Sequence, residues 1–149
     1  MRLLRPIFCL TLVLVTTMLV SCSSPAKAKI PTSYTPERIA QIQEYREPIV
    51  KAREQMSTLE KLIQEENWMD VRTFIHGPLG ELRQNMAITS RKLLPKDQKP
   101  AQEIAKSLFV HFEKLDLAAK ERNLEVAKNE FREAIKDFDA YLQIVPSNG

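Results

Sequence analysis

The chain is poor in cysteine, glycine and histidine: its 149 residues include two cysteines, three glycines and two histidines. Cys9 lies inside the apolar N-terminal run and Cys22 lies at its end, so we expect no structural disulfide in the mature protein. The sequence contains no glycine-rich phosphate loop and no His-Glu-x-x-His or Cys-x-x-Cys pattern. These absences remove the usual signatures of a catalytic site, and the sequence predicts a protein that is not an enzyme.

The mature chain also lacks an excess of either charge. Removal of Arg2 and Arg5 with a leader takes the 22 basic residues down by two, to 20, against 19 acidic residues. A nucleic-acid-binding protein needs a basic excess gathered on one face. The near balance therefore argues against nucleic acid as a partner.

The N-terminus has the three parts of a secretory signal, namely a basic start, an apolar run over residues 7–20 and a small-residue exit. The run is shorter than the roughly 20 apolar residues of a membrane-spanning helix. Leu19-Val20-Ser21-Cys22 resembles the lipobox of bacterial lipoproteins, in which the cysteine takes lipid, including palmitate, and becomes the new N-terminus. This resemblance implies a lipoprotein signal peptide over residues 1–21 and lipidation of Cys22; the alternative is an ordinary signal peptide with a chance cysteine.

Residues 22–35 are poor in large apolar side chains and have the composition of an extended, flexible tether behind the lipidated N-terminus. Thr35-Pro36-Glu37 then has the features of a helix start: a side-chain oxygen for the exposed amides, a proline at the first helical position and an acid in the first turn. We therefore expect the folded domain over residues 36–149.

Four segments of the folded part show apolar residues at helical spacing, and none shows strand-like alternation. Each stripe is about three of every seven residues wide, as in a bundle helix with one side in water. The sequence therefore predicts an all-α protein, an up-down-up-down four-helix bundle. The stripes are Ile42, Ile49, Met56 and Ile63 with Tyr45, Ala52 and Leu59; Trp68, Val71, Ile75, Leu79, Leu82, Met86 and Leu93; Ala101, Ile104, Leu108, Phe112, Leu115 and Ala119; and Leu124, Ala127, Phe131, Ile135, Phe138, Leu142 and Val145.

Prolines and asparagines predict where these helices are disturbed or begin. Pro48 predicts a kink or a lost hydrogen bond in the first helix, and Gly77-Pro78 predicts that the second segment is in two pieces. Residues 95–100, with a proline at each end, predict a polar break before the third helix. Asn67 and Asn123 are the expected N-caps of the second and fourth helices.

The two histidines, His76 and His111, are the sharpest candidates for metal ligands, here for zinc. Each lies beside an apolar stripe, and the pair is not spaced along one helix. A structural zinc site needs four converging ligands. The residues therefore favour histidines at the surface or the core edge, and any zinc bound through them should be weak.

Several stretches resemble the PsbQ family, the extrinsic subunits of photosystem II, and the lipobox makes the cyanobacterial members the closest. The resemblance extends over essentially the whole mature chain, and His76-Gly77-Pro78-Leu79-Gly80 is its most specific part. The stretches are Trp68-Met69-Asp70, Phe74 to Arg83, Leu93-Leu94-Pro95-Lys96-Asp97, Leu115-Asp116 with Ala118-Ala119, and Asp137-Phe138-Asp139 with Tyr141-Leu142 and Pro146.

The resemblance implies a four-helix bundle in the thylakoid lumen, anchored to the thylakoid membrane by lipid on Cys22. It implies docking on the lumenal face of photosystem II, against the core antenna and other extrinsic subunits. The implied role is not catalytic and needs no cofactor of its own: it is to stabilise the oxygen-evolving complex and help retain its calcium and chloride. Zinc has been associated with some members. The alternative is a free periplasmic or lumenal helical-bundle lipoprotein that binds a metal or a small ligand.

Overall fold

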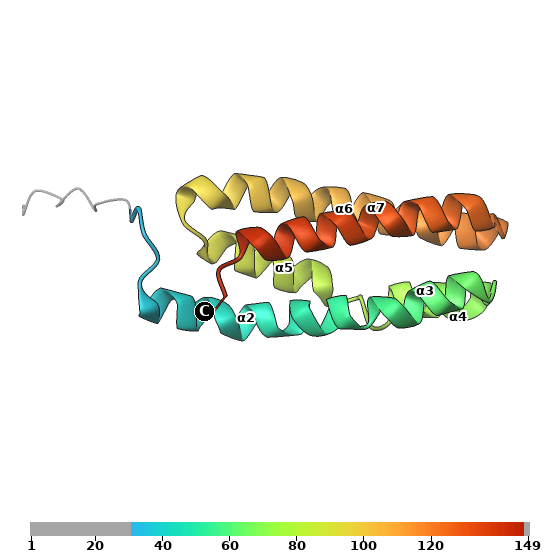
Figure 1. Cartoon of the computed structure of the whole chain (residues 1–149), viewed down its shortest axis with the longest axis horizontal. Coiled ribbons are helices and arrows are strands. Elements are labelled where there is room, and N and C mark those ends of the chain that lie inside the picture. The colour runs from blue at the N-terminus through green and yellow to red at the C-terminus, as the bar shows by residue number, and fades with distance from the viewer. Residues whose placement is uncertain (1–30, 148–149) are drawn as a thin grey trace, which may run out of the picture. The chain divides into compact units, whose positions relative to one another are not determined.

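The computed structural model describes residues 31–147, and this part of the chain is folded entirely as α-helices and their connections. The predicted all-α class is therefore confirmed over these residues. Figure 1 shows the six helices: α2 (Pro36–Glu54), α3 (Met56–Gln64), α4 (Trp68–His76), α5 (Leu82–Lys92), α6 (Pro95–Glu121) and α7 (Leu124–Ile144).

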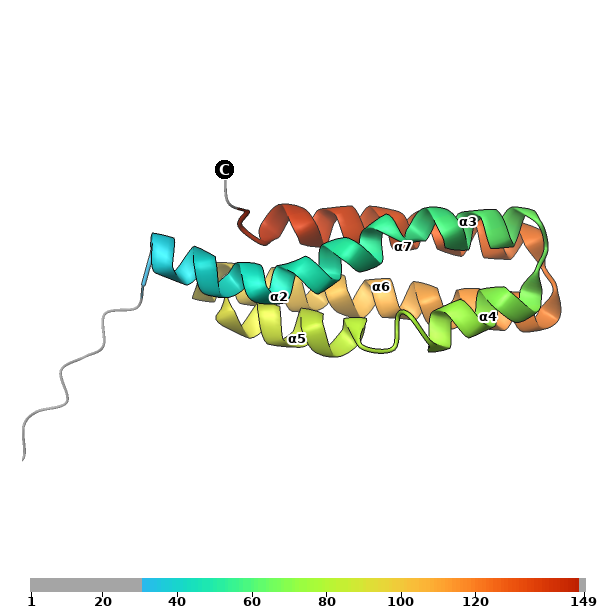
Figure 2. The same cartoon turned by 90° about the horizontal axis from the view of Figure 1, so that it is seen from below.

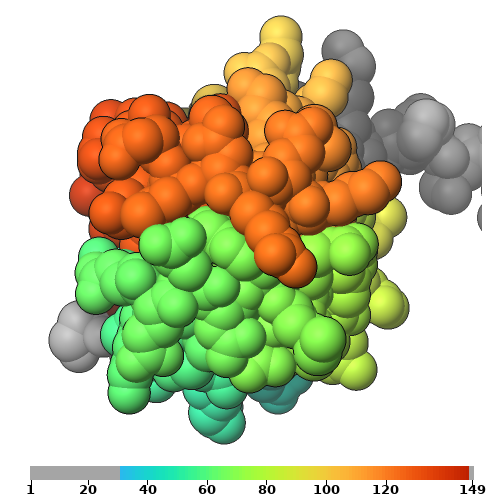
Figure 3. Space-filling view, turned by 90° about the vertical axis from the view of Figure 1, so that its right-hand side faces the viewer, coloured from blue at the N-terminus to red at the C-terminus, as the bar shows by residue number. Residues whose placement is uncertain are grey.

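The helices are laid out as long antiparallel neighbours (Figures 1 and 2). The α2 and α3 helices follow one another in the same direction, and α4 and α5 return alongside them. The α6 and α7 helices form the most extensive pair; α6 also packs on α4 and α5, α7 packs on α3, and α2 packs on α5. Figure 3 looks onto the end where the connection between α3 and α4 meets the connection between α6 and α7.

Three helices begin directly after the N-cap residues that the sequence predicted. The Thr35 side chain accepts a hydrogen bond from the Arg38 backbone N–H (3.3 Å), with Pro36 as the first helical residue. Asn67 caps α4 by accepting from the Asp70 N–H (3.4 Å), and Asn123 caps α7 by accepting from the Val126 N–H (3.1 Å). Each cap satisfies an amide that the first turn of a helix leaves free.

The predicted stripes form one continuous core. The members of the first stripe that recur every seven residues, Ile42, Ile49, Met56 and Ile63, are at most 1% exposed. Trp68, Ile75, Ile104, Leu124, Ile135 and Leu142 are only partly buried and pack against the edge of that core. Tyr141 is fully buried although the predicted fourth stripe did not include it.

The breaks between helices agree with the prediction at one place and differ at another. Residues 77–81 separate α4 from α5, as Gly77-Pro78 predicted. The predicted polar break over residues 95–100 is wrong, because α6 begins at Pro95 and continues through Pro100. Pro95 is the first helical residue, where its missing N–H is not needed, and Pro100 removes only a bond to the carbonyl of the exposed Lys96. The α2 helix continues through Pro48, which has no N–H to donate to the Glu44 carbonyl, so one hydrogen bond is missing there as predicted; the helix ends at Glu54.

The start of α2 is fastened to the junction between α5 and α6. Tyr34, inside the expected tether, donates a hydrogen bond from its hydroxyl to Asp97 Oδ2 (2.8 Å) and accepts one from the Leu94 N–H (3.1 Å). Arg38 donates to the Lys92 carbonyl at 3.0 and 2.9 Å and to the Leu93 carbonyl at 2.9 Å. Ordered contacts therefore begin just before the expected boundary at residue 36. Residues 1–30, with the expected signal peptide, Cys22 and most of the tether, lie outside the described residues.

Candidate functional site

The connection between α4 and α5, residues 77–81, contains most of the motif that is most specific in the sequence. Its backbone is held by hydrogen bonds and by close contacts at two glycines. Gly77 donates its N–H to the Thr73 carbonyl (2.9 Å), and Gly80 donates to the Gly77 carbonyl (2.9 Å). A Cβ on Gly77 would lie 2.9 Å from the Thr73 oxygen, and one on Gly80 would lie 3.1 Å from the Gly77 oxygen. Leu79 is buried between them. A larger residue at Gly77 would therefore force the backbone to shift, and one at Gly80 would be tightly packed against it.

His76 lies at the rim of a hollow of about 450 Å³ between this connection and α6. Its Nε2 is 2.9 Å from Asp116 Oδ1, and the same oxygen accepts a hydrogen bond from Arg72 Nε at 3.0 Å. Across the hollow, Arg83 donates to Glu113 Oε1 (3.0 Å) and its guanidinium lies 4.2 Å from the centre of the Phe109 ring. We call this region, defined by the lining residues Ile75, His76, Leu79, Gly80, Arg83, Phe109, Phe112, Glu113 and Asp116, the connection hollow.

His111 occupies a more enclosed position between α6 and α7, with 19% of its side chain exposed. Its Nδ1 is 2.7 Å from Glu130 Oε2, and its Nε2 is 3.7 Å from Asp137 Oδ2. Lys114 Nζ lies 3.9 Å from the other oxygen of Glu130. Asp137 Oδ2 is buried and has no hydrogen-bond partner within residues 31–147. His111 therefore joins α6 to α7 through a charged cluster at the edge of the core.

The two predicted zinc candidates lie in different clusters. His76 is 64% exposed and is close to Asp116, whereas His111 lies between Glu130 and Asp137 on α7. No group of three or more His, Cys, Asp or Glu side chains able to hold a metal ion is found among the residues that the structure describes. Zinc binding through either histidine stays a prediction.

Sequence reasoning missed the residues that surround these histidines. Asp116 reaches His76 from α6, and Glu130 and Asp137 reach His111 from α7, whereas Arg72 lies on α4 together with His76. Each of these residues lies in a mixed-charge segment that looked like an ordinary solvated face. The available signal was the position of Asp116 and Glu130 beside the buried stripes of α6 and α7. It did not identify which side chain each would meet.

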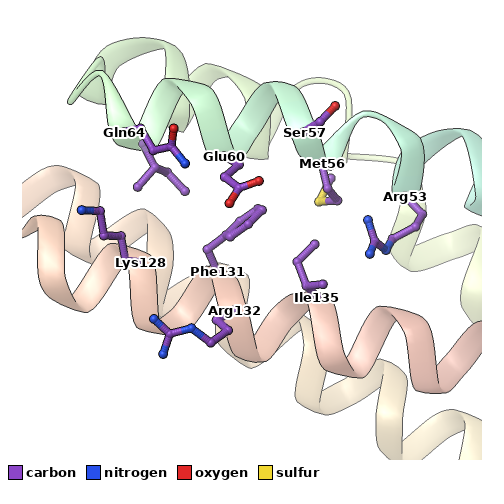
Figure 4. A pocket seen from close by; sticks show the side chains of 10 residues that line it. Arg53, Met56, Ser57, Glu60, Gln64, Lys128, Phe131, Arg132 and Ile135 are labelled. Carbon is purple, nitrogen blue, oxygen red and sulfur yellow. The ribbon is translucent and has the colours of Figure 1, made fainter.

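A second hollow, of about 390 Å³, lies between the α2–α3 segment and α7 (Figure 4). Its floor is apolar: Met56 and Ile63 are 1% exposed, Phe131 is 9% exposed and Ile135 is partly buried. In Figure 4 the Phe131 and Ile135 side chains point from α7 toward α3, and Met56 and Glu60 point back toward α7. We call this region the α3–α7 groove.

Tyr141 is a buried polar residue that belongs to the core and to neither hollow. Its hydroxyl donates to the Met86 carbonyl (2.8 Å) and lies 3.0 Å from Ser90 Oγ, so it joins α7 to α5. Burial raises the pKa of Tyr141 to about 12, although the neighbouring hydroxyls lower it in part. This side chain is therefore neutral at any physiological pH and acts as a structural hydrogen-bond donor.

Within residues 31–147, none of the helices combines the length and the apolar character needed to cross a membrane. The helices there show paired surface charges, two hollows with apolar floors and a polar bond inside the core. Such an arrangement can bind other molecules at its surface.

Two comparisons with known proteins bear on this arrangement. Residues 2–146 match the family model described as PsbQ, oxygen evolving enhancer protein 3. The chain is also 53% identical over 144 residues to the protein named CyanoQ from Synechocystis sp., with 96% of each chain covered. Both similarities extend through all six described helices and the connection between α4 and α5.

Proposed function

The chain belongs to the PsbQ family, and we propose that it is a non-catalytic extrinsic subunit of photosystem II. It docks on the lumenal face of that complex, against the core antenna and other extrinsic subunits. The observation that carries this proposal is the similarity to CyanoQ, which extends over nearly the full length of both chains. A match of this extent includes the whole helical surface and is not restricted to one motif.

We propose that the described helices form the up-down-up-down four-helix bundle expected from the sequence. The α2 and α3 helices together form the first helix of the bundle, and α4 and α5 together form the second. The α6 helix is the third and α7 is the fourth. The packing of α2 on α5, α5 and α4 on α6, α6 on α7, and α7 on α3 supports this arrangement. The core residues of α6 and α7, such as Leu108 and Phe138, then act as its rigid centre.

The N-terminal organisation is proposed from the lipobox: a signal peptide over residues 1–21, lipid on Cys22, and a tether that leads to the bundle over residues 36–149. The lipid holds the protein at the thylakoid membrane, on its lumenal side. Fastening of Tyr34 and Arg38 to the α5–α6 junction supports a defined attachment point for that tether. A Cys22→Ser variant is expected to leave the membrane fraction or remain unprocessed. Membrane retention and lipid labelling equal to those of the parent would contradict the anchor.

The role we propose is to stabilise the oxygen-evolving complex and support retention of its calcium and chloride, which other subunits ligate. Loss of the protein should lower oxygen evolution mildly in replete medium and more strongly when calcium or chloride is scarce. An oxygen electrode measures this in a deletion strain, with the same strain carrying the restored gene as control. Equal rates in both media would count against the role.

Docking itself is tested by purification through a C-terminal tag from gently solubilised membranes, with the bound proteins identified by mass. Photosystem II subunits should co-purify with the tagged chain and be absent from the untagged control. Recovery of the chain alone, or with bound zinc or a small molecule only, would favour the alternative of a free lumenal or periplasmic lipoprotein.

A further inference from the structure

The rim of the α3–α7 groove carries more positive than negative charge. Arg53, Lys128 and Arg132 line the groove, and Glu60 is the acid that lines it. Arg53 is already engaged, because it donates to both oxygens of Asp139 at 2.7 and 3.0 Å, and these hydrogen bonds raise its pKa. Lys128 and Arg132 form no ion pair with any acid among residues 31–147. Two cations are thus available beside an apolar floor.

The connection hollow differs in this respect. Its rim charges neutralise one another, since Asp116 meets both Arg72 and His76, and Arg83 meets Glu113. A partner charge would have to displace a contact that exists already. At the groove, Arg132 donates only to the amide oxygen of Asn129 (3.3 Å), so no ion pair of Lys128 or Arg132 has to be broken, and the groove is the better place for an anionic partner.

The size and floor of the groove fit apolar side chains. Its volume of about 390 Å³ lies in the range of about 300 to 1,000 Å³ that is common for binding sites. Phe131 and Ile135 form the α7 side of the floor, opposite Met56 on α3. Apolar groups placed on these side chains would be removed from water, while charged groups on the same partner could reach the rim.

We propose that the α3–α7 groove is the docking site for a segment of a partner protein that carries apolar side chains flanked by aspartate or glutamate. The apolar side chains cover Phe131 and Ile135, and the carboxylates pair with Lys128 and Arg132. This proposal rests on the proposed function, because it names the surface that faces photosystem II.

The position of the groove favours a protein segment over a lipid surface. The tether joins the bundle at Pro36, and Arg53 at the near end of the groove is 17 residues further along α2. At about 1.5 Å per helical residue this places the groove roughly 25 Å along the bundle from the start of α2, where the proposed tether joins it. A concave groove with an apolar floor and charged side chains at its rim is suited to take the side chains of a protein segment.

Charge changes in the intact chain, expressed in a deletion strain, test the rim. Lys128→Glu with Arg132→Glu should lower the amount that co-purifies with photosystem II by about fivefold, because the double variant loses two exposed ion pairs, each of which contributes a factor of about 1.4 to 5. Glu60→Gln should raise the salt concentration at which the chain is released, because it removes the acid that opposes the partner. Lys106→Glu and Glu121→Gln, exposed positions on α6, are the matched controls and should bind like the parent.

A photoreactive amino acid at Gln64, which lines the groove, identifies the occupant, with the exposed Gln102 on α6 as control. The expected adduct from Gln64 is an acidic, partly apolar peptide of a photosystem II subunit. An adduct with lipid or with a second copy of this chain would overturn the proposal. If circular dichroism shows that the double variant does not fold, the identity of the Gln64 adduct and the salt concentration that releases Glu60→Gln decide whether the groove proposal holds.

The two proposals fail in different ways. If the parent chain does not co-purify with photosystem II, the proposed function fails, and the groove proposal fails with it. If the parent co-purifies while the folded double variant and Glu60→Gln bind as the parent does, only the groove proposal is overturned.

Discussion

Replacing Tyr141 with phenylalanine should change the stability of the bundle in opposite directions at neutral and at alkaline pH. At neutral pH the variant loses the hydrogen bond from the Tyr141 hydroxyl to the Met86 carbonyl, 2.8 Å long and fully buried. Such a bond contributes about 1 kcal/mol to the free energy of unfolding. Ser90 still donates to the same carbonyl at 2.8 Å, so that the carbonyl keeps a partner and the loss should not be larger.

At alkaline pH the parent loses stability that the variant does not lose. Burial raises the pKa of Tyr141 to about 12 from its ordinary value of 10.0, so the folded chain keeps the phenolic proton after the unfolded chain has lost it. Unfolding then releases a proton, and the free energy of unfolding falls as the pH rises above about 10. With pKa values of about 10 and 12, the loss is about 2 kcal/mol at pH 11.5.

The two effects together predict that the order of stability of parent and variant reverses between pH 8 and pH 11.5. The phenylalanine variant should be less stable than the parent by about 1 kcal/mol at pH 8 and more stable by about 1 kcal/mol at pH 11.5. Urea unfolding followed by circular dichroism at both pH values measures this difference. Ionisation of lysines affects parent and variant alike and cancels in the comparison. A difference that stays constant from pH 8 to pH 11.5 would refute the assignment of a raised pKa to Tyr141.

Three further changes test the core, the connection and the histidines. Leu108→Asp places a carboxylate at a fully buried position of α6 and should cost several kcal/mol in urea unfolding; an unchanged midpoint would contradict the packing of α6. Gly77→Ala sets a Cβ 2.9 Å from the Thr73 oxygen and should lower the melting temperature of the chain; a melting temperature equal to the parent's would show that the connection can relax. Calorimetry should find only weak zinc binding, because His111 has few convergent ligands; tight binding that His111→Ala abolishes would contradict this.

Local chemistry explains why the helix starts could be predicted. The side chain of a cap such as Asn123 accepts a hydrogen bond from the amide three residues further along the chain, so both partners can be identified from the local sequence. The same holds for the seven-residue spacing of Ile42 and Ile49, which places both side chains on one face of any regular helix. These features need no knowledge of which helix lies opposite.

The prediction of a polar break over residues 95–100 was wrong because it did not take into account where the two prolines lie in the helix. Pro95 is harmless as the first residue of α6, and Pro100 costs one bond near an exposed end. The apolar contacts of Ala101 and Leu108 lie further along the same helix and are maintained when the helix starts early. Tyr141 was missed for a related reason, since its polar hydroxyl concealed a side chain that finds its partners on α5.

The sequence by itself determined the helical class, the caps and the apolar faces, because these depend on residues within one or two turns of each other. Only the tertiary structure decided that Asp116 meets both Arg72 and His76, while Lys128 and Arg132 meet no acid among residues 31–147. Charges of both signs are spread along most of the helices, and which of them form pairs depends on how neighbouring helices are rotated and shifted against each other. That alignment is set by the packing of the whole core, and within residues 31–147 it left the α3–α7 groove with an apolar floor and two cations that form no ion pair.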